Sequence, residues 1–140
     1  MIKKLSKMLV LTLMCAMVFM GTVHAADKSF SFTLVNTGQR YINFSKNYNK
    51  KEYSSDPWTV KVSTITCYGN YGMSFCPAKY VSGTTTACKS SAMWVNSRGT
   101  HYGKYASGDN SLVNYKLGVR QDDDFSTSFK ASGTFNADKT

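Results

Sequence analysis

The sequence predicts an all-β fold, and three observations support this prediction. Apolar and polar residues alternate with a period of two in several segments, as they do in strands that bury one face. Turn-forming residues separate these segments at short intervals. No window after Ala26 has the apolar spacing of an amphipathic helix. Seven or eight short antiparallel strands at this spacing predict a single β-sandwich, with a small β-barrel as the alternative.

Four segments show the alternation most clearly and are expected as strands over residues 29–34, 58–63, 113–120 and 125–135. Gly133 interrupts the last of them and predicts a bulge or bend. Shorter strands are expected at 73–75, 84–90, 93–95 and 101–105, and turns at 82–83, 97–99, 107–110 and 121–124. Within the irregular stretch 36–56, residues 41–44 are a candidate edge strand. The predicted core consists of Phe30, Phe32, Trp58, Val60, Val62, Tyr115, Leu117, Val119, Phe125 and Phe129.

The first 25 residues have the three parts of an export signal. Three lysines within the first seven residues precede the apolar run Met8–Met20, which is too short to span a bilayer comfortably. Val23-His24-Ala25 then forms an A-x-A-like cleavage site, and cleavage after Ala26 is the alternative. We therefore expect residues 1–25 to be a signal peptide and residues 26–140 to be one secreted β domain, extracellular or associated with the cell envelope, with no transmembrane segment.

The expected mature chain is basic. Without the three lysines of the signal peptide it has 14 basic and 8 acidic residues, a net charge of +6. Exported proteins with this balance often meet anionic partners such as wall polymers or acidic glycans. Only three of the basic residues are arginines, the type best suited to bidentate phosphate recognition, so specific nucleic-acid binding is not expected.

Three cysteines remain after cleavage: Cys67, Cys76 and Cys88. Export permits disulfides, and Cys76 and Cys88 flank the predicted turn at 82–83, so we expect them to face each other across a hairpin. Such a bond contributes about 3 kcal/mol in the chain-entropy model. A Cys67–Cys76 bond is the alternative. His101 is the only histidine after the signal peptide and no C-x-x-C spacing occurs, so neither a metal site nor a cofactor is expected.

One segment interleaves aromatic and basic residues and is the predicted binding surface. Aromatic stacking combined with cations binds sugars, single-stranded nucleic acid and anionic polymers. An edge strand that packs its tyrosines and leaves its lysines in water produces the same pattern. A weaker aromatic set, Trp94, Tyr102 and Tyr105, is a candidate sugar-binding face, with core packing as the alternative. The candidate binding residues are Tyr41, Lys46, Tyr48, Lys50, Lys51 and Tyr53.

Short motifs at 30–33, 56–62 and 99–102 are spread over most of the mature chain. They read Phe-Ser-Phe-Thr, Asp-Pro-Trp-Thr-Val-Lys-Val and Gly-Thr-His-Tyr, and Tyr105 follows the last of them. In these motifs the chain resembles a family of small exported proteins of Gram-positive bacteria that is catalogued only as a domain of unknown function. The resemblance implies a secreted β-rich domain, and it provides no catalytic or binding residues.

The expected function is that of a non-catalytic secreted protein that binds anionic polymers or glycans of the cell envelope or the extracellular space. A bacteriocin-like antagonist is one alternative, since Tyr68-Gly69-Asn70-Tyr71-Gly72 is similar to the Tyr-Gly-Asn-Gly-Val motif of anti-listerial bacteriocins. A small hydrolase that pairs His101 with Cys76 or Cys88 is another. Because a hydrogen-bonded strand histidine is the simpler interpretation of His101, no catalytic residue is assigned and no enzymatic activity is expected.

Overall fold

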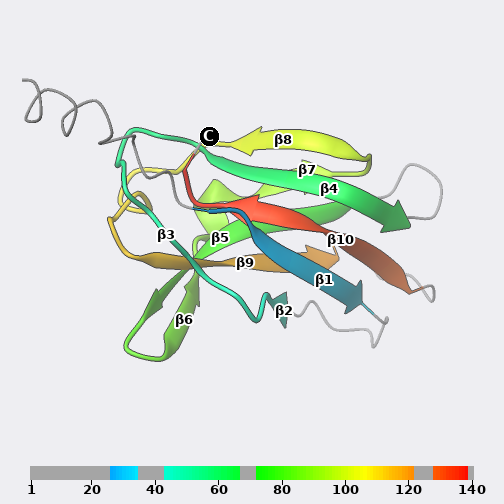
Figure 1. Cartoon of the computed structure of the whole chain (residues 1–140), viewed down its shortest axis with the longest axis horizontal. Coiled ribbons are helices and arrows are strands. Elements are labelled where there is room, and N and C mark those ends of the chain that lie inside the picture. The colour runs from blue at the N-terminus through cyan, green and yellow to red at the C-terminus, as the bar shows by residue number, and fades with distance from the viewer. Residues whose placement is uncertain (1–25, 35–42, 67–71, 122–127, 139–140) are drawn as a thin grey trace, which may run out of the picture.

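Two antiparallel sheets make up the fold (Figure 1). The computed structural model describes residues 26–34, 43–66, 72–121 and 128–138. The four-stranded sheet has the order β1 (Lys28–Leu34), β10 (Phe129–Asn136), β4 (Trp58–Thr66) and β8 (Gly99–Gly103). The six-stranded sheet has the order β2 (Asn43–Phe44), β9 (Asn114–Gln121), β5 (Met73–Val81) and β6 (Thr84–Ala87), with β3 (Asn49–Lys50) beside β9 and β7 (Met93–Val95) beside β5. The predicted all-β, antiparallel fold class is therefore confirmed.

The core lies between the two sheets and is built by the predicted alternation. In β4, for example, Trp58, Val60 and Val62 are buried while Lys61 is exposed. The ring of Phe30 in β1 lies 5.8 Å from that of Phe75 in β5, which joins the two sheets. Burial of each such side chain stabilises the fold by about 1.5–3 kcal/mol. All predicted core residues in the described part are buried, and Phe125 lies outside it.

The strand β5 is longer than the sequence pattern predicts. Residues 73–75 alternate weakly, but the strand runs from Met73 to Val81, and its first six residues are all buried. β5 is a central strand, with β9 on one side and β6 and β7 on the other. Its inward Phe75 packs in the core, and its outward Cys76 lies beside Lys89 and Arg120 on the other face. A strand buried on both faces has no polar face and so gives no period of two.

Pro77 is tolerated inside this central strand because it lies in a gap between two partner strands. β7 pairs with β5 as far as Phe75, and the β6 ladder starts at Ala78. The Pro77 carbonyl accepts a hydrogen bond from the Cys88 amide at 2.9 Å. In a regular antiparallel pair, residue 77 would also donate a hydrogen bond from its own amide N–H. Proline has no N–H, so it fits at this position, where the pairing with β7 has ended and the pairing with β6 has not yet begun.

The shorter predicted elements are confirmed with shifted bounds. The turn at 82–83 joins β5 to β6, and Ser82 and Gly83 have φ values of 50° and 82°, as primed hairpin turns require. The strand expected at 84–90 ends at Ala87 and is followed by the 3-10 turn Lys89–Ser91. The strand expected at 101–105 runs from Gly99 to Gly103. Of the candidate edge strand at 41–44, Asn43–Phe44 forms β2, and 41–42 lies outside the described residues.

The bulge predicted at Gly133 is present in β10. The register between β10 and β4 shifts between Ser132 and Gly133. A Cβ atom at Gly133 would lie 1.9 Å from the carbonyl oxygen of Lys61, a backbone atom that moves only with its strand. The close approach of the two strands therefore depends on the missing side chain.

We predict that Gly133→Ala lowers the free energy of unfolding by about 1–3 kcal/mol or more, because the added methyl group forces β10 and β4 apart. Urea-induced unfolding measures the change. Ser31→Ala, at an exposed position of β1, is the control and is expected to stay within about 0.5 kcal/mol of the parent protein. Equal stability of both variants would contradict the bulge geometry.

A buried ion pair ties the end of β10 to the segment after β3. Lys51 and Asp138 are both fully buried, with 2.9 Å between Lys51 Nζ and Asp138 Oδ1. Lys51 Nζ also donates to the carbonyl oxygens of Asp56 (2.8 Å) and Ala137 (3.2 Å), and it lies 4.3 Å from the ring centroid of Tyr105. Asp138 accepts from the amides of residues 52 and 53. The pair is thus hydrogen-bonded on all sides, as a buried pair must be to offset desolvation.

Loss of one partner leaves the other charge buried and uncompensated. We predict that Lys51→Met lowers the free energy of unfolding by about 3–5 kcal/mol. The adjacent Lys50→Met is the matched control: Lys50 pairs with Glu52 at 3.2 Å on the surface, and its loss costs at most about 1 kcal/mol. In urea unfolding, the double variant Lys51→Met/Asp138→Leu is expected to regain much of the loss. Similar midpoints for the two single variants would refute the buried pair.

Candidate functional site

The predicted binding residues have different positions in the structure. Lys46, Tyr48, Lys50 and Tyr53 are exposed, and Tyr41 lies outside the described residues. Lys51 is fully buried in the ion pair with Asp138, so its prediction as a surface-binding residue is wrong. Lys51 is buried because it contacts Asp138, which lies 87 positions later in the sequence. The residue types around Lys51 give no sign of this distant contact.

The exposed residues around β3 join residues of β9 and β5 on the outer face of the six-stranded sheet. Lys50 pairs with Asn114, which in turn pairs with Tyr80, so these three positions form one row across the sheet. Tyr48 directly precedes β3, and Lys116 lies two residues after Asn114 in β9, on the same face of that strand. The neighbouring Tyr115 and Leu117 point into the core, so this face of β9 points outward.

Aromatic and cationic groups contact one another on this outer face. The ring centroids of Tyr48 and Tyr80 are 5.3 Å apart, and Lys116 Nζ lies 4.4 Å from the Tyr80 centroid. Tyr48 is 47% exposed. We call Tyr48, Lys50, Tyr80 and Lys116 the tyrosine–lysine face. The sequence did not identify Tyr80 and Lys116 because they lie more than 25 residues from the predicted segment, and only strand pairing brings them to it.

The predicted disulfide between Cys76 and Cys88 is absent, and both residues are buried free thiols. Cys88 continues the β5–β6 register opposite Pro77, so its side chain points into the core, where it packs in the main cluster. Cys76 is the next residue along β5 and points to the other face, beside Ser74 and Arg120. Side chains on opposite faces of a sheet cannot be bridged without backbone movement. The alternative partner Cys67 lies outside the described residues.

Burial raises the pKa of both thiols to about 11, so they stay protonated near neutral pH. We predict slow alkylation of Cys76 and Cys88 by iodoacetamide in the native protein at about pH 8, and fast alkylation in urea, followed by peptide mapping. Folding holds these thiols neutral, so their contribution to stability is complete below about pH 9 and is lost as pH rises towards 11. Recovery of a Cys76–Cys88 cross-linked peptide without reductant would contradict the free thiols.

His101 lies in β8 opposite Val60. Its Nε2 atom is 3.0 Å from the carbonyl oxygen of Ser97, and no hydrogen bond joins it to Cys76 or Cys88. The structure therefore does not form the cysteine–histidine pair of the hydrolase hypothesis. Of the second aromatic set, Tyr105 is half-buried and donates to the Ala137 carbonyl, whereas Trp94 and Tyr102 are 51% and 56% exposed on different sheets.

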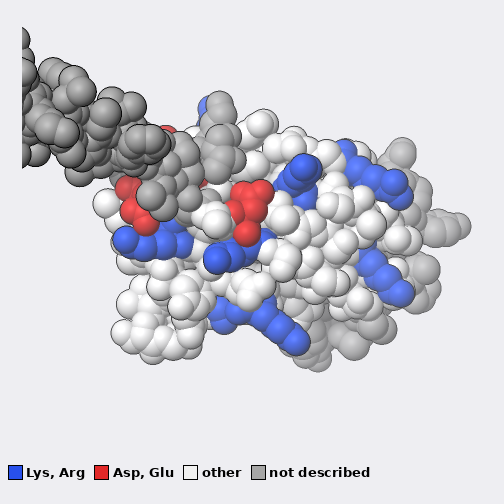
Figure 2. All heavy atoms as spheres, in the orientation of Figure 1, with Lys and Arg blue, Asp and Glu red and all other residues white. Residues whose placement is uncertain are grey.

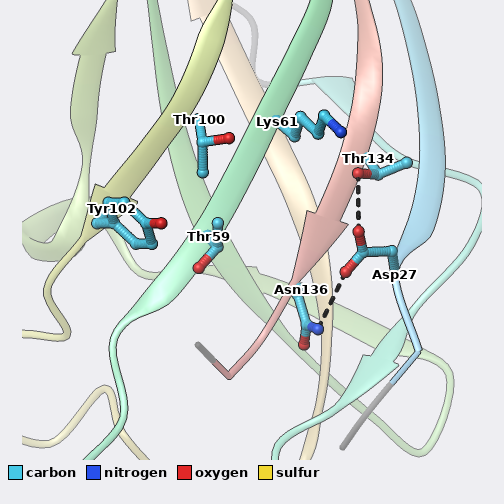
Figure 3. A pocket seen from close by; sticks show the side chains of 7 residues that line it. All are labelled: Asp27, Thr59, Lys61, Thr100, Tyr102, Thr134 and Asn136. Carbon is cyan, nitrogen blue, oxygen red and sulfur yellow. Dashed lines mark hydrogen bonds between the residues drawn. The ribbon is translucent and has the colours of Figure 1, made fainter. Parts of the chain in front are cut away.

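A polar hollow of about 240 Å³ opens on the outer face of the four-stranded sheet (Figure 3). Its residues come from three strands of that sheet, β4, β8 and β10, and from Asp27, the residue just before β1. The register places Asn136, Thr59 and Tyr102 in one row and Thr134, Lys61 and Thr100 in the next. Sequence reasoning missed the hollow because these are the ordinary polar positions of alternating strands. The lining residues are Asp27, Thr59, Lys61, Thr100, Tyr102, Thr134 and Asn136.

A larger hollow, of about 360 Å³, lies beside the turn at 54–55. Its walls include Asp56, Lys104 and Asn110, and Asn110 donates to the Ser54 carbonyl at 3.2 Å. The Tyr105 side chain at its base is already engaged with Lys51 and Ala137. The Asn110–Ser54 hydrogen bond therefore helps to hold the turn in place.

The described residues contain no cluster of three or more histidine, cysteine, aspartate or glutamate side chains that could hold a metal ion. In the same residues, no helix is long and apolar enough to cross a membrane. Comparisons with protein-family models, with curated proteins and with solved structures found no match. The resemblance to small exported proteins of Gram-positive bacteria thus stays a prediction.

Proposed function

We propose that this protein is a non-catalytic secreted module that binds an anionic polymer of the cell envelope or the extracellular space through the tyrosine–lysine face. The observation that carries the proposal is the contact of Tyr48 and Lys116 with the same ring, that of Tyr80. It places a cation over one ring of a contacting tyrosine pair on a sheet face.

The charge of this face supports an anionic ligand. Among the described carboxylates, none lies within ion-pair distance of Lys116, and Lys50 pairs only with the exposed Glu52. An exposed pair of this kind is weak and exchanges readily with another anion. Lys116 therefore keeps its charge available to a ligand, and the positive net charge of the expected mature chain adds long-range attraction.

The aromatic part of the face supports a polymer rather than a small ion. Tyr48 offers a half-exposed ring with a polar hydroxyl, which can pack along the apolar edge of a repeating unit while its hydroxyl stays hydrated. The face is also elongated, because Lys50, Asn114 and Tyr80 form a row of paired positions across three strands. Rings together with ammonium groups bind a chain with alternating apolar and anionic parts.

Removal of either component is expected to weaken binding. We predict that Lys116→Gln and Tyr48→Ala each reduce affinity for immobilised polyphosphate or polygalacturonate by about three- to tenfold, equivalent to about 0.7–1.4 kcal/mol. Affinity is measured at low and at physiological ionic strength, and higher salt is expected to weaken binding. The two polymers distinguish phosphate from carboxylate as the preferred group.

Lys130→Gln is the matched control, because it removes the same charge from an exposed position on the four-stranded sheet. It is expected to retain nearly the parent affinity. An equal loss in the Lys130 and Lys116 variants would mean that net charge alone governs retention. That result, or no retention of the parent protein on either polymer at low ionic strength, would refute the proposal.

A further inference from the structure

The polar hollow lies on the outer face of the four-stranded sheet, whereas the tyrosine–lysine face belongs to the six-stranded sheet. The chemistry of the two surfaces differs. In Figure 2, which looks onto the four-stranded sheet, lysine and arginine side chains are spread over the surface, with acidic side chains among them in the left half of the view. This face is therefore not a strongly cationic patch. The hollow itself combines one carboxylate, one ammonium group, an amide and four hydroxyl groups.

Asp27 is held in place at one side of the hollow. Its Oδ2 atom accepts from Thr134 Oγ1 at 3.1 Å, and its Oδ1 atom accepts from Asn136 Nδ2 at 3.1 Å (Figure 3). Asn136 is 2% exposed, and its Oδ1 atom accepts from the Asp138 amide. A carboxylate has about four acceptor positions, so the oriented Asp27 can still accept from a ligand hydroxyl.

Lys61 supplies a donor on the same side. Its side chain extends across the sheet surface toward Thr134 (Figure 3), and its ammonium group lies beyond ion-pair distance from Asp27. The hollow thus contains a donor, the Lys61 ammonium group, and a separate acceptor, the Asp27 carboxylate. An alcohol hydroxyl can bond to either of them, because it both donates and accepts hydrogen bonds.

Thr59 contributes an unpartnered polar atom in the row between Asn136 and Tyr102. Its Oγ1 atom is buried and has no hydrogen-bond partner among the described residues. A buried hydroxyl without a partner costs about 1–3 kcal/mol, and such groups are rare in folded proteins. Because Thr59 lines the hollow, a rotation of its side chain would expose this atom to a ligand hydroxyl, and the new hydrogen bond would recover that free energy.

Tyr102 forms the opposite wall. Its side chain is 56% exposed, and its hydroxyl points towards Thr59 (Figure 3). Since a phenol ring has an apolar face and a polar tip, it can pack against the C–H face of a sugar ring while its hydroxyl bonds at the edge. Specific small-molecule sites have this composition, an apolar surface with a few convergent polar groups.

From this arrangement we propose that the polar hollow binds one uncharged sugar residue of a glycan. The balanced charges of Asp27 and Lys61 do not select an ion, and the mixture of donors and acceptors matches a polyol. A volume of about 240 Å³ is below the roughly 300–1,000 Å³ of sites that enclose drug-sized ligands, so it suits a single ring rather than a longer segment.

The test titrates the isotopically labelled protein with neutral cello-, malto- and chito-oligosaccharides and follows amide NMR shifts. At least one probe is expected to shift resonances of β1, β4, β8 and β10. Tyr102→Ala is expected to weaken that binding at least tenfold. Absence of shifts with all three probes, or shifts confined to the six-stranded sheet, would overturn the proposal.

Thr59→Val separates a binding role from a structural one. Valine has nearly the same shape and lacks the unpartnered hydroxyl, so the variant is expected to be as stable as the parent protein or more stable. Its affinity for the sugar is nevertheless expected to fall about three- to tenfold. Unchanged affinity in both the Thr59→Val and Tyr102→Ala variants would overturn the proposal.

Ser31→Ala, at an exposed position of β1 outside the hollow, is the control and is expected to bind the sugar like the parent protein. Lys116→Gln is also expected to leave sugar binding unchanged, because Lys116 lies on the other sheet. Failure of sugar binding can thus be distinguished from failure of polyanion binding.

Discussion

The buried ion pair between Lys51 and Asp138 is the contact on which both candidate surfaces depend. On one side of the pair, the backbone amide of Asp138 donates a hydrogen bond to the Asn136 side chain. Asn136 in turn donates to Asp27 and orients it in the polar hollow. On the other side, Lys51 directly follows β3, the short strand that carries Lys50 and positions Tyr48. A two-residue strand has little stability of its own. The ion pair supplies the long-range anchor that such a strand lacks.

The sheet positions that the sequence predicted correctly are those where one face is buried and the other is wet. In β4, Trp58 and Val60 point inward while Lys61 points outward, so the apolar and charged residue types of the sequence distinguish the two faces. Alternation gives no signal in β5, where the outward Cys76 is buried like the inward Phe75. Periodicity reports a difference between two faces, so it is lost when that difference is absent.

The candidate sites were harder to predict because they depend on contacts between distant segments. Lys50 and Lys51 are adjacent and chemically identical, yet one is exposed and the other is fully buried against Asp138. Similarly, the spacing of Cys76 and Cys88 around a turn suggested a disulfide, whereas the register places them on opposite faces. A one-residue difference in register reverses the direction of a side chain, and the number of residues between two cysteines does not fix it.

The two faces of the sandwich carry different chemistry for a reason that lies in the fold. Each strand sends alternate residues inward, so the outward residues of the two sheets are free to differ. Two packed sheets are separated by about 10 Å of core side chains, which keeps a ligand on one face from touching the other. Tyr80 and Lys116 therefore lie on a different surface from Tyr102 and Thr59, and the two surfaces are connected only through the Lys51–Asp138 pair described above. Substitutions of these four residues, which leave that pair intact, are expected to have additive effects, as is usual for distant sites.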